Sequence, residues 1–369
     1  MLKIVAVSDV TLGFGSPQIP NFVKFLKTHY TNSAAVVIEP DQLKNEYAKD
    51  RHSEFELVRV PTFANVHSKL GRIEYLNSVV PLVNKYRPDI LVIFCTFTLP
   101  ILLRLKSRPT FTIYYNIEMA SYYGSMDDFL NTSLSDRIDL LIYPEKNRAM
   151  LDINKYGDRG IPTAVVVNAE SDVTNDLELS LNERSLKIIY QGTIDAVNTN
   201  AGYFLDELFE EYRIDLYGNF SGAEAGNLRS EFLKLNRKVR YIGYVESHIL
   251  KEIRKKYAYS IVMWAPVNEN QYYAAPNKFF EALADGIPPI SAPHPQCEYF
   301  IKKYNCGILM EDWSKESLAK AIEIAINMYG TPAYKKMVEN CIKATEKEAT
   351  WQIQMDKVKP YLKDIGADL

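Results

Sequence analysis

Short apolar runs alternate along the chain with longer stretches in which apolar residues recur every three or four positions. In the first half of the chain, the apolar runs lie at residues 2–8, 34–38, 55–60, 90–94, 109–115, 139–143 and 163–167. Residues 17–30 and 71–86 show the helical spacing instead. Because most of each run is apolar, these strands should be buried on both faces, in a parallel sheet covered by helices.

The alternation lapses in a polar, acidic stretch at residues 170–184 and then starts again. Two Rossmann-like α/β domains, residues 1–170 and 185–351, joined by a linker at 171–184, are the simplest account. In the second domain, strands are expected at residues 187–190, 214–217, 239–242, 260–264, 289–292 and 307–310, with helices at 202–212, 224–235, 249–256, 276–285 and 314–329. Two further helices, at 333–350 and 352–365, exceed what the second sheet should need.

Composition and charge exclude several classes of protein. A formal net charge of −3 and a pI near 6.1 argue against a dedicated nucleic-acid binder, which usually carries a basic excess. The four cysteines and five histidines show no metal-ligand spacing, so we expect no metal. The amino terminus does not read as a secretory signal, and the longest apolar run, residues 90–103, is shorter than the ~20 residues that span a bilayer. A cytoplasmic protein is therefore expected.

The strongest candidate for chemistry is the short helix expected at residues 276–285. Pro276 suits the first turn of a helix, and the Gly-Ile-Pro sequence at 286–288 ends it. The first turn offers free backbone N–H groups and the positive end of the helix dipole, and Lys278 adds a full charge. Glu281 lies one turn further along the same face. The pair could bind an anion and hydroxyl groups, or it could be a solvated surface ion pair.

The sequence at residues 276–288, Pro-Asn-Lys-Phe-Phe-Glu-Ala-Leu-Ala-Asp-Gly-Ile-Pro, resembles the donor-site helix of glycosyltransferase family 4. Four more segments resemble that family in order and spacing: residues 190–193 (Tyr-Gln-Gly-Thr), 216–218 (Leu-Tyr-Gly), 242–245 (Ile-Gly-Tyr-Val) and 305–308 (Asn-Cys-Gly-Ile). The resemblance covers residues 185–351 by motif and the first half by architecture. It implies the GT-B fold, in which two Rossmann-like domains flank a cleft and the last helix, here 352–369, crosses back to the first domain.

The resemblance also implies which residues bind a nucleoside-diphosphate sugar. The diphosphate would lie near Asn277 and Lys278, with Lys278 stabilising the leaving group, and Glu281 would hold the ribose. Backbone near Tyr244 and Val245 would meet the base, with core packing as an equal alternative. The other implied donor-binding positions are Gly13, Gly15, Gln191, Gly192, Thr193, Tyr217, Gly218, Tyr273 and Pro276, of which Gly13 and Gly15 could equally form an ordinary turn.

Two departures from the family bear on donor recognition. Tyr273 stands where the family keeps a carboxylate, and residues 198–200 (Asn-Thr-Asn) lie where it keeps an arginine and a lysine. A tyrosine can still make one hydrogen bond to the donor sugar, although it brings no charge. Tyr272 or Glu269 could take its place. Lys278 then becomes the one strong phosphate-binding cation that we expect.

In the first domain, Glu118 follows the strand expected at residues 109–115, where α/β proteins place functional groups. We expect it to contact the acceptor hydroxyl or transfer its proton; the alternative is a helix N-terminal acid. Residues 99–108, which interleave basic residues with leucines, either cover the sheet as a helix or contact a membrane carrying a lipid-linked acceptor. The charged run at residues 251–256 is expected to be a solvated helix face.

The activity implied by the resemblance is that of a hexosyltransferase. It would transfer a sugar from a UDP- or GDP-sugar to a hydroxyl of a saccharide or lipid-linked acceptor, with retention and without a metal, in bacterial polysaccharide or glycoconjugate synthesis. One alternative is a sugar-nucleotide epimerase or a phosphorylase on the same fold. The other is a non-catalytic protein that binds nucleotide-sugars or scaffolds a complex.

Overall fold

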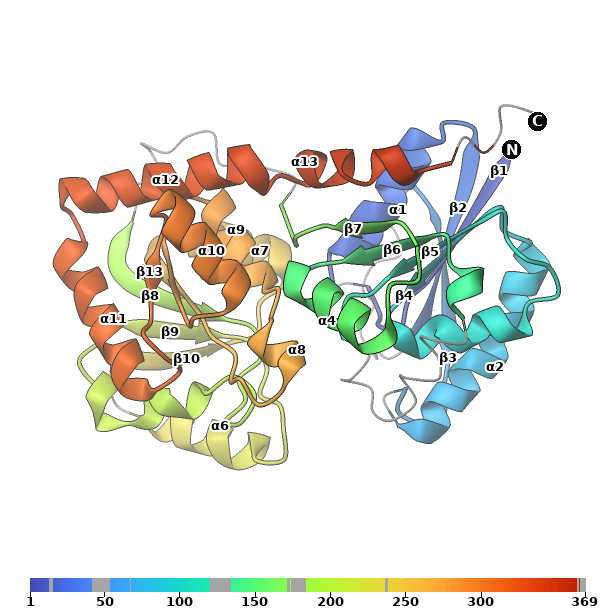
Figure 1. The fold of residues 1–369 in the computed structure, drawn as a ribbon. Helices are drawn as coiled ribbons and strands as arrows, with labels where there is room; N and C mark the ends of the chain where they lie inside the picture. Colours follow the sequence, from blue (N-terminus) through green and yellow to red (C-terminus); the bar gives the residue numbers. More distant parts are fainter. Residues whose placement is uncertain are drawn as a thin grey trace. The chain divides into compact units, whose positions relative to one another are not determined.

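The computed structural model describes residues 1–12, 16–41, 54–66, 68–119, 134–170, 173, 184–235, 238–363 and 365. It divides into two compact units (Figure 1). Unit 1 comprises Met1–Val166 together with Met355–Leu369, and unit 2 comprises Val167–Gln354. Of the linker predicted at residues 171–184, all but Val173 and Arg184 lies outside the described residues.

Unit 1 is built on a parallel sheet of seven strands in the order β3-β2-β1-β4-β5-β6-β7. The strands are β1 (Leu2–Val7), β2 (Ser33–Asp41), β3 (Glu56–Pro61), β4 (Ile90–Phe94), β5 (Phe111–Tyr115), β6 (Leu140–Tyr143) and β7 (Thr163–Val165). The helices are α1 (Gln18–His29), α2 (Lys69–Tyr86) and α4 (Lys146–Tyr156), with 3-10 segments η2 (Thr96–Arg104), η4 (Ser135–Arg137) and η7 (Lys359–Tyr361).

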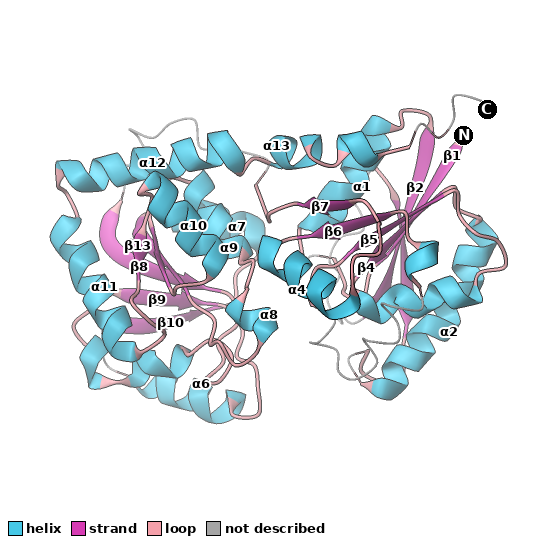
Figure 2. Cartoon of the chain, in the orientation of Figure 1, coloured by secondary structure: helices cyan, strands magenta, loops and turns pink. Residues whose placement is uncertain are grey.

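Helices cover both faces of this sheet, as the apolar strands predicted (Figure 2). From α1, Phe22 packs edge-on against Phe94 of β4 and Tyr115 of β5, with ring centroids 6.4 and 5.4 Å away. From α2, Tyr75 packs in a cluster with Leu91, which lies on the opposite face of β4 because neighbouring strand residues alternate in direction.

Unit 2 has a parallel sheet of six strands in the order β10-β9-β8-β11-β12-β13. They are β8 (Ser185–Gln191), β9 (Ile214–Tyr217), β10 (Val239–Gly243), β11 (Tyr257–Val262), β12 (Pro289–Ser291) and β13 (Ile308–Leu309). The helical elements are η5 (Ala201–Leu205), η6 (Glu207–Phe209), α6 (Ala225–Lys234), α7 (Ser247–Arg254), α8 (Glu269–Tyr272), α9 (Asn277–Ala284), α10 (Pro295–Tyr304), α11 (Lys315–Met328) and α12 (Pro332–Glu348). The helix α13 (Trp351–Asp356) contains the boundary between the units.

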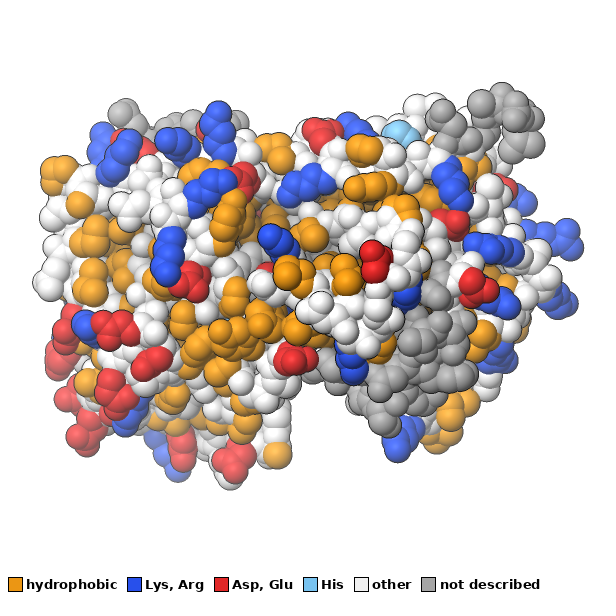
Figure 3. Space-filling model, viewed as in Figure 1, with side chains coloured by type: hydrophobic (Ala, Val, Ile, Leu, Met, Phe, Trp, Pro, Cys, Tyr) orange, Lys and Arg blue, Asp and Glu red, His pale blue; other side chains and the backbone are white. Residues whose placement is uncertain are grey.

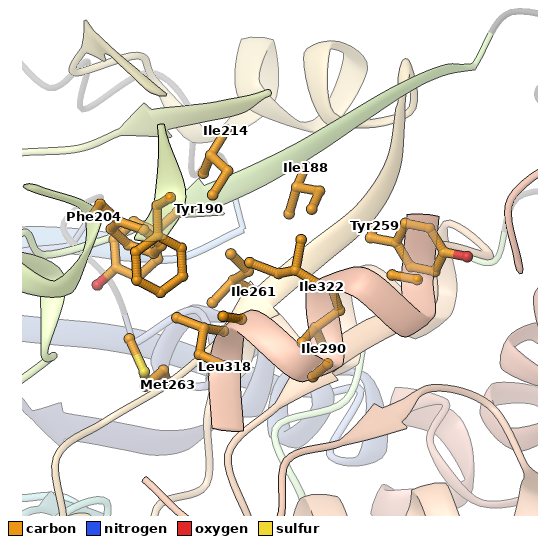
Figure 4. Packing of buried hydrophobic residues seen from close by; sticks show 14 of the residues in the cluster. Ile188, Tyr190, Phe204, Ile214, Tyr259, Ile261, Met263, Ile290, Leu318 and Ile322 are labelled. Carbon is orange, nitrogen blue, oxygen red and sulfur yellow. The ribbon is translucent and has the colours of Figure 1, made fainter. Parts of the chain in front are cut away.

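The core of unit 2 lies between its sheet and the helices on one face. In Figure 4, Leu318 and Ile322 of α11 lie against Ile261 of β11 and Ile290 of β12. A separate cluster buries the apolar side of α9 against α10 and α12, with Phe279, Phe280 and Leu283 as its α9 members. This packing fixes α9 and leaves its other side for polar residues.

Three expected helices differ in the structure. The helix at residues 202–212 is replaced by η5 and η6, because Asp206 is extended and its carboxylate accepts the N–H of Leu208 at 3.0 Å, starting a new turn. Of residues 99–108, only 99–104 are helical, in the 3-10 segment η2 that ends at Arg104. The last helix ends at Asp356, and η7 with Pro360 follows, since proline has no N–H to continue a helix. The prediction of two α/β domains with parallel sheets is confirmed.

Candidate functional site

The candidate site of unit 2 lies at the carboxyl ends of its two central strands. The strand order reverses between β8 and β11, so the loops that leave these strands diverge to opposite sides. Such a switch point forms the usual ligand-binding crevice of an open α/β sheet. Gly192 follows β8 directly, Trp264 follows β11, and the side chain of Lys278 from α9 extends to both.

The amine of Lys278 is buried and has no hydrogen-bonding partner among the described residues. The residue is only 8% exposed. Its Nζ lies 5.1 Å from the ring centroid of Tyr190 and 5.0 Å from that of Trp264, within the range of cation–π attraction. This Nζ makes no hydrogen bond within the described structure. Burial lowers the pKa of Lys278 to about 8, because removal from water disfavours the charged amine.

Two glycines keep the backbone clear around this amine. A Cβ on Gly192 would lie 2.7 Å from the Lys278 Nζ, and Gly192 has φ +123°, which side chains rarely adopt. A Cβ on Gly218 would lie 1.7 Å from the carbonyl oxygen of Gly192. The N–H of Gly192 donates to Tyr217, and that of Gly218 donates to Gly243, at 2.9 and 3.0 Å. The loops after β8, β9 and β10 are therefore joined by backbone hydrogen bonds.

Other polar atoms beside Lys278 also lack partners. The Oδ1 of Asn277 and the Oε1 of Gln191 are buried and make no hydrogen bond within the described structure. The helix α9 starts after Pro276, which supplies no side-chain cap. The structure places Pro276 at the N-cap, one residue before the helix. Buried polar groups usually find a partner, so this concentration of unsatisfied groups indicates a ligand site.

Glu281 belongs to a buried ion-pair network and not to a surface pair with Lys278. Its Oε2 accepts hydrogen bonds from Gln191 Nε2 at 2.5 Å and from Arg254 Nη1 at 2.6 Å. The Nε of Arg254 donates to Asp285 Oδ2 at 2.6 Å. The expectation that residues 251–256 form a solvated face is wrong for Arg254, whose side chain is 4% exposed. Burial raises the pKa of Glu170, and the negative charge of Glu281 raises it further.

The remaining predicted residues of unit 2 divide between the core and the surface. Tyr217 is buried, and its hydroxyl lies 3.0 Å from that of Tyr257. Val245 packs beside this pair, whereas Tyr244 is 47% exposed. Other predicted positions are Thr193, whose carbonyl accepts the Tyr190 hydroxyl at 2.6 Å, and Tyr273, which is half-buried with its ring edge-on to Tyr272 at 4.8 Å.

In unit 1, Gly13 and Gly15 lie outside the described residues. Glu118 follows β5, as expected, and its side chain is 40% exposed. Its Oε2 lies 3.4 Å from Arg148 Nη1, which also donates to the carbonyl of Ile117 at 2.8 Å. The two halves of the predicted site are thus described separately, the donor residues in unit 2 and Glu118 in unit 1.

Sequence reasoning missed several residues that shape the site. Trp264 and the ring of Tyr190 enclose Lys278, and Arg254 and Asp285 hold Glu281. Trp264 could have been found, because it closely follows a strand end in an α/β domain. Arg254 could not, because it stands among similar charges in residues 251–256 and only packing distinguishes it.

His294 also helps to shape this site. It is fully buried, and its Nε2 accepts the N–H of Trp264 at 3.2 Å. Its Nδ1 then carries the proton and donates to the carbonyl of Tyr272 at 3.1 Å. The ring therefore ties the loop after β11 to α8.

Two further features of the described residues concern metals and membranes. Within the described ranges, no group of three or more His, Cys, Asp or Glu side chains could hold a metal ion. Among the helices that the structure describes, none has the length and apolarity to cross a membrane. On the face drawn in Figure 3, acidic side chains gather at the lower left, beside the lower end of α11, while lysines and arginines are spread.

Residues 185–327 match the family model of glycosyl transferases group 1. No curated protein matches the chain in sequence. The chain shares its fold with sucrose-phosphate synthase from Thermosynechococcus elongatus, at 13% identity, a TM-score of 0.70 and 98% coverage of both chains. HepE from Anabaena, solved with UDP and glucose, matches at 13% identity and a TM-score of 0.70, covering 98% of this chain and 99% of that one. WaaG, a glycosyltransferase involved in lipopolysaccharide biosynthesis, matches at 13% identity and a TM-score of 0.69, covering 97% and 99%. The protein is therefore a two-domain α/β protein with the GT-B fold, whose residues 185–327 match the group 1 glycosyltransferase family model.

Proposed function

We propose that the protein transfers a sugar from a UDP- or GDP-sugar to an acceptor hydroxyl. The observation that carries this proposal is the buried, unpartnered Nζ of Lys278 at the start of α9. It lies at the switch point of a domain that matches the group 1 family. A lysine that folding leaves buried and unpaired is poised to receive a negatively charged ligand. HepE, which has the same fold, was solved with UDP-glucose bound, which favours a nucleotide-sugar as that ligand.

Lys278 and the N-terminus of α9 would hold the diphosphate, and they would stabilise the charge that develops as the glycosidic bond breaks. The orphaned Asn277 Oδ1 and Gln191 Oε1 would accept hydrogen bonds from the sugar or the ribose. Glu281 would bind the ribose hydroxyls, and the exposed Tyr244 would lie near the base. Tyr273 would shape the pocket for the donor sugar.

Several finer features of the reaction are part of the proposal. We propose that Glu118 contacts the acceptor, that Gly13 and Gly15 lie near the donor phosphates, and that the outcome is retention. The positive charge of Lys278 and the helix end would replace a metal, and no cofactor would be needed. The acceptor would be a saccharide or a lipid-linked saccharide in bacterial polysaccharide or glycoconjugate synthesis, made by a cytoplasmic or membrane-associated enzyme.

The site also suits a protein that binds a nucleotide-sugar without catalysis, because the family's carboxylate is replaced by Tyr273. Incubation with UDP-glucose, UDP-galactose and their GDP counterparts, with and without saccharide acceptors, separates the two functions. Release of UDP or GDP by the wild type, abolished in Lys278→Met, supports a transferase. Tight binding with no release of nucleotide, with any donor, would support the binding protein. An isomerised donor would reveal an epimerase instead.

A further inference from the structure

Arg254 lies at the C-terminal end of α7 and joins Glu281 of α9 to Asp285, the residue that follows this helix. The guanidinium donates through Nη1 to Glu281 Oε2 and through Nε to Asp285 Oδ2, both at 2.6 Å. The arginine side chain is 4% exposed and that of Asp285 is 1% exposed, whereas that of Glu281 is 23% exposed. The network therefore has a buried anchor at Asp285 and an open end at Glu281.

The anchor itself is held by the backbone. The carbonyl of Asp285 accepts a hydrogen bond from Arg184 Nη2 at 2.7 Å, and its N–H donates to the carbonyl of Glu281 at 3.2 Å. Because a guanidinium is planar, fixing Nε on Asp285 also fixes the direction of Nη1. The position of Oε2 on Glu281 follows from that direction, and Gln191 Nε2 secures the same oxygen at 2.5 Å.

The two carboxylate oxygens of Glu281 therefore differ in their hydrogen bonding. Within the described part of the chain, both hydrogen bonds to Glu281 go to Oε2 and none goes to Oε1. A carboxylate accepts about four hydrogen bonds, so Oε1 keeps its full capacity for a ligand. The charged groups that interact with this network include Glu170, Asp285, Lys251, Arg254 and Lys278. Arg254 is the cation that is hydrogen-bonded to both Glu281 and Asp285.

We infer that Arg254 is a positioning residue for ribose recognition. It holds Glu281 turned so that Oε1 faces the vicinal hydroxyls of the donor's ribose, while Arg254 itself does not touch the ligand. This inference rests on the proposed function, which assigns ribose binding to Glu281. A purely structural role would predict a general loss of stability and of all nucleotide binding alike.

The test compares two ligands that differ only in the hydroxyls. Dissociation constants of UDP and of 2′,3′-dideoxy-UDP (or the guanosine pair, if the wild type binds GDP better) are measured by calorimetry for the wild type, Arg254→Met and Arg254→Lys. Arg240→Met serves as the matched control, because Arg240 also pairs with one carboxylate through two nitrogens, on Asp215, away from Glu281.

The wild type and Arg240→Met should prefer the ribonucleotide ~10-fold or more, the effect of hydrogen bonds to a charged group. Arg254→Met should lower that preference to about 3-fold or less and leave the dideoxynucleotide affinity nearly unchanged. If Arg254→Met does not fold, Arg254→Lys decides, because its single point charge cannot hold both carboxylates. A preserved preference in the folded arginine variant overturns the inference but not the proposed function. Wild-type binding without a preference overturns the ribose role of Glu281 as well, and absence of nucleotide binding overturns the proposed function itself.

Discussion

At the scale of single residues, the site is defined by a lysine that costs the unliganded protein stability. Removing a charged amine from water is unfavourable, and this one makes no hydrogen bond among the described residues to offset the cost. The rings of Tyr190 and Trp264 offset part of this desolvation cost through cation–π attraction. A bound diphosphate would supply the missing partner, so ligand binding and the charge of Lys278 should be linked.

Replacing Lys278 by Met should therefore separate function from stability. Turnover should fall ~100-fold or more, as when one electrostatic donor to the transition state is removed. The unliganded variant should unfold at a higher temperature than the wild type at pH 7, since a buried charge is gone. The surface control Lys336→Met, which loses an i,i+3 contact to Glu339, should change neither. Wild-type turnover in folded Lys278→Met would mean that the amine has no catalytic role.

The same lysine predicts a pH dependence of stability. Its pKa of about 8 in the folded protein is below the ordinary value of 10.5, so the unfolded chain binds more protons between these values. Through this lysine, the free energy of unfolding should therefore rise with pH between 8 and 10.5. This rise should be absent in Lys278→Met. Ligand affinity should instead fall as the pH rises, because a diphosphate favours the charged amine. UDP affinity should fall about tenfold per pH unit above pH 8 in the wild type and stay flat in the variant, which titration calorimetry can measure.

Glu281→Gln should act mainly on donor binding. The ribose does not change during the reaction, so KM for the donor should rise several-fold with a smaller effect on kcat. Because Arg254 loses one of its two carboxylates, the melting temperature should fall as well, by about 2–4 °C for each kcal/mol lost. Steady-state kinetics on the folded variant measure the changes in KM and kcat separately. An unchanged KM would remove Glu281 from the donor site.

At the scale of elements, the three loops after β8, β9 and β10 are joined by backbone hydrogen bonds. Gly192 and Gly218 lie in two of these loops and serve different purposes. A Cβ on Gly218 would meet backbone, whereas a Cβ on Gly192 would meet the end of a flexible side chain. The helix α9 is set independently, by the burial of its apolar side against α10 and α12.

Two alanine substitutions should show this difference. Gly218→Ala places a Cβ 1.7 Å from the Gly192 carbonyl oxygen, so we expect severe destabilisation and poor soluble expression. Gly192→Ala should fold, with some strain from its positive φ, but it should displace the Lys278 amine and weaken UDP binding by about tenfold or more. Melting temperature and calorimetry distinguish the two effects. Tight UDP binding by Gly192→Ala would show that the amine does not reach the phosphates.

At the scale of the whole molecule, each unit is a complete α/β layer structure, and the chain returns to unit 1 at Met355. The division of roles proposed here gives the donor to unit 2 and the acceptor to unit 1. Charge stabilisation would come from α9 and Lys278 alone.

Turnover should therefore survive chelation. With 5–10 mM EDTA present, roughly the wild-type rate is expected, because the helix end and the lysine provide the positive charge that a metal would. Added Mg²⁺ or Mn²⁺ should not raise the rate. Loss of activity in EDTA that returns with a divalent cation would contradict the proposed mechanism.

The sequence by itself determined the layers of both units. Uniform apolar runs can be satisfied only by burial on both faces, so the strands, their parallel arrangement and the helices between them could be read from the pattern. The boundaries of α9 could be read too, because proline and glycine act locally on the backbone. Where the cues were weaker, as at Asp206 and Pro360, the helices were predicted too long.

Only the tertiary structure decided which charges are buried and with what they pair. Lys278 and Glu281 lie three residues apart, yet the first ends between two aromatic rings and the second on Arg254. Arg254 carries the same formal charge as its neighbours Lys251, Lys255 and Lys256, and composition cannot distinguish them. The difference arises because side chains distant in sequence meet at a strand-order reversal. There, desolvation and pairing are set by packing and not by the local pattern.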